Sequence, residues 1–302
     1  MPDSDSNWRE LYPFASNFLE TAGHRIHYID EGPRSGDPVL MVHGNPTWSF
    51  YWRGLISKLS YERSRTVAID HMGCGLSDKP SKFDYCLASH RDNLCSLIDH
   101  LDLKNVTLMA HDWGGAIGLS TLLKRRERFK RIVLFNTGAF PPPYVPLRIR
   151  ACRWPLVGQL GVRGLNMFAR AAITMATEQR GGLPDRVAAG MIAPYDSWAN
   201  RIAIYHFVKD IPVTRMHRTW KLLAEVEKQL PSLASMPSML VWGMKDWCFR
   251  PECLERFVKA WPDAEVHRLD DAGHYVVEDA AGEVEDLAAE FVGRAIAEST
   301  GE

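Results

Sequence analysis

The chain has 302 residues, of which 46% are hydrophobic and 24% are charged, and its formal net charge at pH 7 is -1. These values are typical of a globular enzyme with a sizeable core. They argue against a general nucleic-acid-binding protein, which would carry an excess of basic residues. The basic run at residues 124–131 is interpreted as a solvated helix end.

The ends, apolar runs and cysteines of the chain predict a cytoplasmic protein. The opening segment MPDSDSNWRE is acidic and polar, unlike a secretory signal peptide. The longest uncharged stretch, residues 132–147, holds four prolines and is therefore not a membrane span. The six cysteines have neither CxxC nor histidine-linked spacing, which favours reduced thiols and predicts no metal site.

Short β-rich runs alternate with helix-length segments along the chain. The predicted strands are residues 25–29, 39–42, 66–69, 106–110, 132–135, 239–242 and 265–269, and the predicted helices include residues 92–101 and 254–260. Several of these strands are continuous apolar runs, which is typical of parallel strands buried on both faces. The pattern predicts an α/β fold with a mostly parallel, doubly wound sheet.

The alternation stops between about residues 137 and 212. This region opens with three consecutive prolines at 141–143 and continues with amphipathic helical patterns. In DSWANRIAIYHFVKDIP, Asp196 or Ser197 can cap a helix whose apolar stripe comprises Trp198, Ile202, Tyr205 and Val208. We therefore predict a core in two parts, residues 1–136 and 213–302. A helical cap, residues 137–212, is expected over the carboxyl ends of the strands, where open α/β sheets bind ligands.

The stretch MAHDWGGAI, residues 109–117, has the layout of a nucleophile elbow, a sharp turn between a strand and a helix. Asp112 takes the central position, and Ala110 and Gly114 flank it because strand and helix must approach closely there. The N-terminal amides of the helix are expected to keep the carboxylate ionised. Asp112 is predicted to be a nucleophile; the alternative is an aspartate that only caps the helix.

Two further positions predict hydrogen-bond donors beside Asp112. In MVHGNPTWSF, Asn45 follows the glycine, where this kind of fold places an oxyanion-hole amide, and its side chain adds an NH2 group. Trp113 adds an indole N–H directly after the nucleophile. Together these donors suit an anionic leaving group or a polarised oxygen. For Trp113 taken alone, core packing is an equal alternative.

A histidine and an aspartate complete the predicted constellation. His274 in DDAGHYVVED follows the last predicted strand, and Asp246 in WGMKDW follows the strand before it. The order along the chain is nucleophile, acid, histidine, which is that of α/β hydrolases. We predict that His274 is the base and that Asp246 orients it; a structural turn is the alternative for Asp246. Asp270 and Asp271 are interpreted as turn formers.

Nearly the whole chain resembles the α/β-hydrolase superfamily, specifically its haloalkane-dehalogenase-like branch. The resemblance lies in HGNPTWSFYWR, DHMGCGLSDKP, AHDWGG and AGHYVVED. It implies that Asp112 attacks carbon, that Asn45 and Trp113 hold the departing halide, and that His274 activates water. One large dehalogenase group has a glutamate after the strand equivalent to residues 132–135, where this chain has FNTGAF, so the acid role passes to Asp246. No cofactor is expected, because the glycine pair in DHMGCGLSDKP is far short of a dinucleotide fingerprint.

The segments GAFPPPYVPLRIRACRWPLVGQLGVRGLNMFARAA and IAPYDSWANRIAIYHFVKDIP resemble the β-lactone decarboxylases of bacterial long-chain olefin biosynthesis. This resemblance implies conversion of cis-3,4-dialkyl-2-oxetanones, small apolar substrates with alkyl chains, to cis-alkenes and carbon dioxide. The apolar, arginine-rich cap leaves three roles open: a tunnel for long chains, docking on a membrane surface, or docking on other olefin-biosynthesis enzymes. The oligomeric state also stays open.

Three other functions remain open at this point. A hydrolytic haloalkane dehalogenase would use the same residues. An epoxide hydrolase also uses an elbow aspartate but needs paired cap tyrosines, for which Tyr144, Tyr195 and Tyr205 are available without an evident pairing. A catalytically silent binding protein of this fold would have no need of an intact set of Asp112, Asp246 and His274.

Overall fold

The computed structural model describes residues 8–300, and the side chains of residues 8–294. Its centre is an eight-stranded sheet with the strand order β1-β2-β4-β3-β5-β6-β7-β8. The strands are β1 Asn17–Thr21, β2 His24–Glu31, β3 Pro38–Val42, β4 Arg65–Ile69, β5 Val106–Asp112, β6 Phe129–Thr137, β7 Ser238–Gly243 and β8 Glu265–Leu269. The β1–β2 and β2–β4 pairs are antiparallel, and the other neighbouring strands are parallel.

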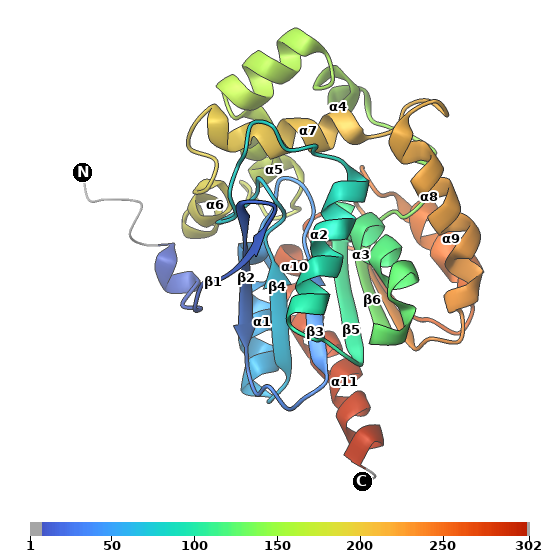
Figure 1. Ribbon diagram of the computed structural model, residues 1–302. Helices are drawn as coiled ribbons and strands as arrows, with labels where there is room; N and C mark the ends of the chain where they lie inside the picture. The colour runs from blue at the N-terminus through green and yellow to red at the C-terminus, as the bar shows by residue number, and fades with distance from the viewer. Residues whose placement is uncertain (1–7, 301–302) are drawn as a thin grey trace.

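Helices cover both faces of this sheet (Figure 1). They are α1 Arg53–Tyr61, α2 Leu87–His100, α3 Trp113–Lys124, α8 Arg218–Gln229, α9 Pro251–Ala260, α10 Val276–Asp279 and α11 Ala281–Thr300. Side chains along a strand alternate between the two faces. Leu40 and Val42 belong to one core, with side chains of α2, α3, α8 and α9, whereas Val39 and Met41 belong to the other, with side chains of α1 and α11.

Each of the seven predicted strands lies within an observed strand, and both predicted helices are confirmed with earlier starts, at Leu87 and Pro251. The prediction missed β1. This strand lies at the sheet edge and only its central residue, Leu19, is buried, so it lacks the apolar signal of a core strand. β8 lies at the opposite edge, and only Leu269 in it is fully buried.

Between β6 and β7 the chain leaves the sheet and forms a series of helices, here called the 137–212 segment. They include α4 Leu147–Ala151, η4 Val157–Gly164, which is π-helical, α5 Met167–Met175, α6 Asp185–Ile192 and α7 Ile202–Asp210. In Figure 1 they lie at the top of the molecule, above the carboxyl ends of the parallel strands. This arrangement places the segment over the loops that carry the predicted site residues.

One prediction within this segment is wrong. Ile202, Tyr205 and Val208 are buried as predicted, but Trp198 precedes α7 and is 45% exposed. The guanidinium group of Arg163 stacks on the Trp198 ring instead. Of the two predicted caps, Ser197 makes a capping hydrogen bond, but to the short 3-10 turn before α7 and not to α7 itself: its Oγ atom accepts from Asn200 N at 3.2 Å. This turn rotates Trp198 away from the apolar stripe.

Two further observations concern the cysteines and the helices. All six cysteine thiols are free. None of the helices within residues 8–300 combines the length and the apolar character that a bilayer span requires.

Candidate active site

Asp112 occupies the turn between β5 and α3, with backbone angles φ 53° and ψ −126°. A positive φ is rare for a residue other than glycine and is typical of strained functional turns. Two glycines make room for this turn. A Cβ atom on Gly114 would collide with the carbonyl oxygen of Val42, and one on Gly44 would collide with the Asp112 carboxylate. The predicted elbow geometry is therefore present.

The two carboxylate oxygens of Asp112 have different neighbours. Oδ1 accepts a hydrogen bond from the backbone N–H of Asn45 at 2.7 Å, and the backbone N–H of Trp113 also bonds the carboxylate. Oδ2 lies 3.7 Å from His274 Nε2. Burial raises the pKa of Asp112, while His274 and the two N–H groups lower it only in part. The helix amide of Trp113 thus lowers the Asp112 pKa as expected, and Asn45 N in the loop after β3 does the same, but burial outweighs both.

His274 lies between two carboxylates. Its Nδ1 atom is 2.9 Å from Asp246 Oδ2, and its Nε2 atom faces Asp112. Burial acts to lower the pKa of His274, but the negative charges of Asp246 and Asp112 together outweigh burial and raise the pKa above its usual value. The structure therefore brings the predicted nucleophile, base and acid into one chain of contacts.

Asn136, at the end of β6, holds Asp246 in place and was not predicted. Its Nδ2 atom donates to Asp246 Oδ2 at 3.0 Å and to the carbonyl of Gly243 at 3.0 Å, while its Oδ1 atom accepts from Gly243 N at 2.7 Å. Cys248 N donates to the other oxygen, Asp246 Oδ1, at 2.6 Å. Asn136 is the asparagine of FNTGAF, and a polar residue at the end of an apolar strand was the signal that could have identified it.

His111 contacts the backbone of His274 and was also not predicted. It precedes Asp112 in β5 and is fully buried. Its Nε2 atom lies 2.8 Å from the backbone oxygen of His274, so this nitrogen carries the proton and donates it. Burial lowers the pKa of His111 well below its usual value, so the ring stays neutral. His111 therefore fixes the loop of His274 without adding charge.

The side chains of Asn45 and Trp113 both line a cavity next to Asp112. Asn45 Nδ2 donates to the carbonyl of Ile204 in α7 at 3.4 Å, which leaves its second hydrogen for another acceptor. The indole N–H of Trp113 has no hydrogen-bond partner in the described part of the chain. Its ring packs against Phe207, with the ring centroids 5.6 Å apart. The packing role considered for Trp113 is therefore observed, and its unpaired indole N–H stays available for the predicted donor role.

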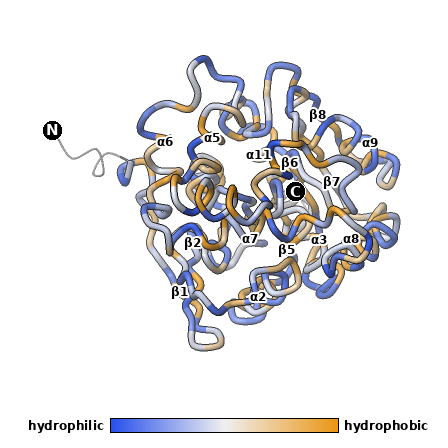
Figure 2. Tube along the Cα trace, turned by 90° about the horizontal axis from the view of Figure 1, so that it is seen from above, coloured by the Kyte–Doolittle hydropathy of each residue, from blue (hydrophilic) through white to orange (hydrophobic). Residues whose placement is uncertain are grey.

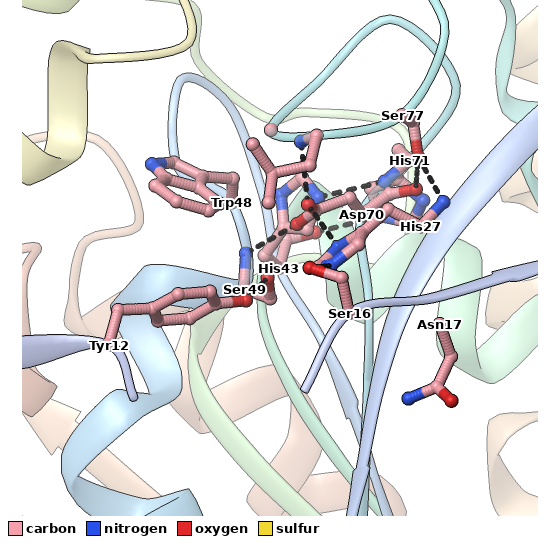
Figure 3. Close-up of polar contacts among 12 residues, drawn as sticks. Tyr12, Ser16, Asn17, His27, His43, Trp48, Ser49, Asp70, His71 and Ser77 are labelled. Carbon is pink, nitrogen blue, oxygen red and sulfur yellow. Dashed lines mark hydrogen bonds and ion pairs between the residues drawn. The ribbon is translucent and has the colours of Figure 1, made fainter. Parts of the chain in front are cut away.

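A buried polar network anchors the loop that carries Asn45, as Figure 3 shows. Asp70 Oδ1 accepts from Ser49 N at 2.7 Å, and Asp70 Oδ2 lies 2.8 Å from His27 Nδ1. His71 N donates to His43 Nε2 at 3.0 Å. The sequence predicted only a tight turn in DHMGCGLSDKP. Asp70 also ties this turn to one end of the Asn45 loop through Ser49, and His71 ties it to the other end through His43.

The cavity has a volume of about 590 Å³ and lies between the sheet and the 137–212 segment. Asp112, His274, Asn45 and Trp113 line it together with many apolar side chains, whereas Asp246 lies behind His274. Of the three tyrosines considered for an epoxide hydrolase, only Tyr144 lines the cavity. Tyr195 is fully buried, and its hydroxyl group donates to the carbonyl of Thr47 at 3.2 Å.

Known proteins resemble this chain over most of its length. A cis-3-alkyl-4-alkyloxetan-2-one decarboxylase of Shewanella oneidensis is 42% identical over 280 residues, which cover 91% of this chain and 87% of the relative. Haloalkane dehalogenase 2 of Mycobacterium tuberculosis is 36% identical over 275 residues, covering 90% and 92%. The haloalkane dehalogenase DbeA of Bradyrhizobium elkani has the same fold, with a TM-score of 0.85 and 22% identity over 94% of this chain and 99% of that one.

A model of the alpha/beta hydrolase fold family matches residues 37–151 and 166–281. The two matched stretches span the elbow, the Asn45 loop, Asp246 and His274, and so include every residue that the sequence predicted for the site. The chain therefore belongs to the alpha/beta hydrolase fold family, in the group that contains the cis-3-alkyl-4-alkyloxetan-2-one decarboxylases and the haloalkane dehalogenases.

Proposed function

We propose that this enzyme converts cis-3,4-dialkyl-2-oxetanones to cis-alkenes and carbon dioxide. The observation that carries the proposal is a carboxylate positioned to attack carbon, Asp112, in the wall of a largely apolar cavity of about 590 Å³. Such a cavity suits a substrate with two alkyl chains and one small polar ring. The 42% identity to a protein named for this reaction supports the same choice.

In the first step, Asp112 Oδ2 attacks the ring carbon that carries the lactone oxygen. The carbon–oxygen bond of the strained ring breaks, and its electrons leave with the ring oxygen, which becomes part of a free carboxylate. The product is an alkyl ester of Asp112, formed with inversion at the attacked carbon. Asn45 N donates to Asp112 Oδ1, so Oδ2 is the oxygen that faces the substrate.

In the second step, the new carboxylate leaves as carbon dioxide. The electrons of the broken carbon–carbon bond form the alkene, and Asp112 departs with both of its oxygens. Inversion followed by anti elimination gives net syn loss, so a cis-lactone yields a cis-alkene. The N–H groups of Asn45 and Trp113 that line the cavity would stabilise the carboxylate between the two steps.

A competing path begins with attack of Asp112 on the lactone carbonyl carbon, which breaks the acyl carbon–oxygen bond, gives a mixed anhydride and leaves the ring oxygen as an alkoxide on the other ring carbon. In that path the same donors would stabilise the tetrahedral oxyanion. Attack at the ring carbon forms the alkene without water, so that path does not need His274 as a general base. Its raised pKa and its position between Asp112 and Asp246 support an electrostatic role, in which a positive charge offsets the carboxylates nearby.

The proposal extends to the organisation of the chain. Residues 137–212 act as a cap over a core formed by residues 1–136 and 213–302, and the cavity between them holds the alkyl chains. The side chains of Arg148, Val157 and Phe168 in this segment line the cavity and support this division. The free thiols support a cytoplasmic site of action.

The direct test is incubation of the purified enzyme with a synthetic cis-dialkyl β-lactone, followed by gas chromatography of the organic phase. We expect the cis-alkene and an equal amount of carbon dioxide. Recovery of a β-hydroxy acid instead of the alkene would contradict the proposal, because it would show that water completes the reaction.

The second candidate is a haloalkane dehalogenase, in which water hydrolyses the alkyl ester of Asp112. The indole N–H of Trp113, which lines the cavity without a protein partner, fits a halide and favours this candidate. A panel of haloalkanes separates the two functions. Halide release without any turnover of the β-lactone would replace the proposed function with this one.

A further inference from the structure

The outer surface of the 137–212 segment is unusually apolar for a surface in contact with water. Six of its large apolar side chains are between 54% and 75% exposed: Leu147, Trp154, Leu156, Leu160, Leu165 and Met167. In Figure 1 the helix η4 lies at the top of the molecule, and Figure 2, which looks down on this end, shows hydrophobic turns around α5 and α7. These side chains come from α4, η4, α5 and the turns between them, residues 147–167, and exposed apolar residues gathered in one part of a surface mark an interaction surface.

The part of this segment that bears the exposed apolar side chains has charged residues of one sign only, all of them positive. Residues 140–177 contain five arginines and neither a lysine nor an acidic residue, in a chain whose formal net charge is -1. The arginines are Arg148, Arg150, Arg153, Arg163 and Arg170. The remainder of the chain therefore carries a net charge of -6, since -1 minus +5 is -6. This distribution concentrates the basic charge of the cap beside its exposed apolar side chains.

These arginines also lack acidic partners. Several arginines elsewhere on the surface pair with carboxylates, as Arg125 does with Asp99 at 2.9 Å. Within the described part of the chain, none of the five arginines of residues 140–177 forms an ion pair. Arg148 stacks on Trp247 and Arg153 bonds backbone carbonyls, while Arg150 and Arg170 extend into solvent. The positive charges of Arg150 and Arg170 are therefore the ones most available to an external anion.

The active-site cavity reaches the surface through the same region. Tyr144, Val157, Met167 and Met175 all line the cavity, and each of them is also between 38% and 54% exposed. A molecule that enters between these side chains would approach Asp112 from the apolar, arginine-bearing side of the enzyme.

We propose that this face docks on an anionic lipid surface. The leucines and Trp154 would enter the boundary between headgroups and acyl chains, and the arginines would pair with lipid phosphates. A water-insoluble substrate with two alkyl chains would then pass from the bilayer through the cavity mouth to Asp112. This last step rests on the proposed function, whereas the docking itself does not.

The test measures binding of the full chain to vesicles by flotation, without substrate. We expect binding to vesicles of phosphatidylcholine and phosphatidylglycerol, weaker binding to pure phosphatidylcholine, and loss of binding at high salt. Because each basic residue near an anionic membrane strengthens binding about fivefold, the Arg150→Glu/Arg170→Glu variant should bind at least about 25-fold more weakly. Leu156→Ser/Leu160→Ser should weaken binding by about tenfold or more.

The matched control is Tyr61→Ser/Arg126→Glu, which removes one exposed apolar and one exposed basic side chain at the opposite end of the sheet. This variant should bind vesicles as the wild type does. None of the four substituted cap residues lines the cavity, so turnover of a soluble short-chain substrate should stay unchanged in the cap variants.

Equal vesicle binding by the cap variants and the wild type would overturn the proposal. Absence of vesicle binding by the wild type would overturn it as well, and a partner protein that requires Leu156 and Arg150 would then be the occupant of this face. Because vesicle binding is read without catalysis, a failure here is distinct from a failure of the β-lactone assay.

Discussion

The two carboxylate oxygens of Asp112 have different neighbours, and under the proposed function this difference gives a prediction about the fate of water. Oδ1 is bound by Asn45 N at 2.7 Å, which leaves Oδ2 for the carbon. In the proposed elimination, Asp112 leaves with both of its own oxygens. A single turnover of β-lactone in heavy-oxygen water should therefore leave the Asp112 peptide unlabelled by mass spectrometry.

Hydrolysis of the alkyl ester would instead place a solvent oxygen in the Asp112 carboxylate, so a haloalkane that is turned over provides the positive control. Alkene formed together with stoichiometric label in Asp112 would contradict the elimination mechanism. The Asp112→Ala variant should show no turnover of either substrate, because no neighbouring group can replace a positioned carbon nucleophile.

The raised pKa values of Asp112 and His274 predict different pH profiles for the two reactions. Asp112 must be ionised to attack, so both rates fall as the pH drops through its pKa, which burial has raised above the usual carboxyl range. Hydrolysis also needs a neutral His274, whose pKa the carboxylates raise, so halide release should fall already at a higher pH than alkene release. Measurement of both profiles between weakly acidic and neutral pH checks this.

Each pH profile has an acid limb, the range in which the rate falls as the pH drops. The test is whether the acid limb of halide release lies at higher pH than that of alkene release. Asp246→Asn removes a negative charge 2.9 Å from His274 and should shift the limb of halide release to lower pH by more than the limb of alkene release, because Asp246 is the main cause of the raised His274 pKa and only a minor one for Asp112. Identical limbs for both reactions would mean that His274 acts as a base in alkene formation too.

Asp246→Asn also separates the reactions by rate. The imidazole would lose its orienting and charge-compensating partner, and by analogy with hydrolytic triads halide release should fall by roughly two to four orders of magnitude. Alkene release should fall less, because no proton is transferred in the elimination. Asn136→Ala removes a donor to Asp246 and should give a smaller loss in halide release. A near-normal hydrolytic rate in Asp246→Asn would place the orienting acid elsewhere.

At the scale of elements, the site depends on the close approach of α3 to β3. Gly114 lies in the first turn of α3, and a Cβ atom there would meet the backbone carbonyl of Val42, which cannot move aside. Gly114→Ala should therefore destabilise the protein by about 1–3 kcal/mol and reduce activity, because the elbow would shift. Urea denaturation and the alkene assay measure the two effects.

Gly118→Ala is the matched control in the same helix. A Cβ atom at Gly118 would come within 2.9 Å of Leu108 Cδ1, the mobile end of a side chain, and helix propensity favours alanine over glycine by about 1 kcal/mol. We expect little net change in its stability. Equal destabilisation by the two substitutions would contradict the role given to the α3–β3 contact.

At the scale of the whole molecule, the cavity between sheet and cap predicts how the rate depends on alkyl chain length. Each methylene buried in an apolar cavity contributes about 0.8 kcal/mol, so kcat/KM should rise about fourfold per methylene until the chains fill the cavity. A series of cis-dialkyl β-lactones of increasing length measures this. Ala172 lines the cavity, so Ala172→Phe should move the optimum to shorter chains. A rate independent of chain length would show that the alkyl groups bind elsewhere.

The sequence by itself determined the sheet and singled out the residues that the structure brings together beside the cavity. Buried parallel strands are continuous apolar runs, and the elbow and the late histidine occur in local motifs with a fixed order along the chain, so residue patterns sufficed for Asp112, Asp246 and His274. The edge strand β1 was not predicted, because it buries a single side chain and so lacks the apolar pattern of a core strand. Trp198 was misplaced because a 3-10 turn interrupts the helical period just before α7.

Only the tertiary structure decided which distant groups hold these residues. Asn136 reaches Asp246 because β6 and β7 are neighbours in the sheet, and Asp70 reaches Ser49 because two loops meet after their strands. The net direction of the Asp112 pKa also depends on burial, which local sequence does not reveal. Hydrogen bonds between residues far apart in sequence, and the desolvation of a charge, exist only once the chain has folded, because both depend on which surfaces the fold brings together.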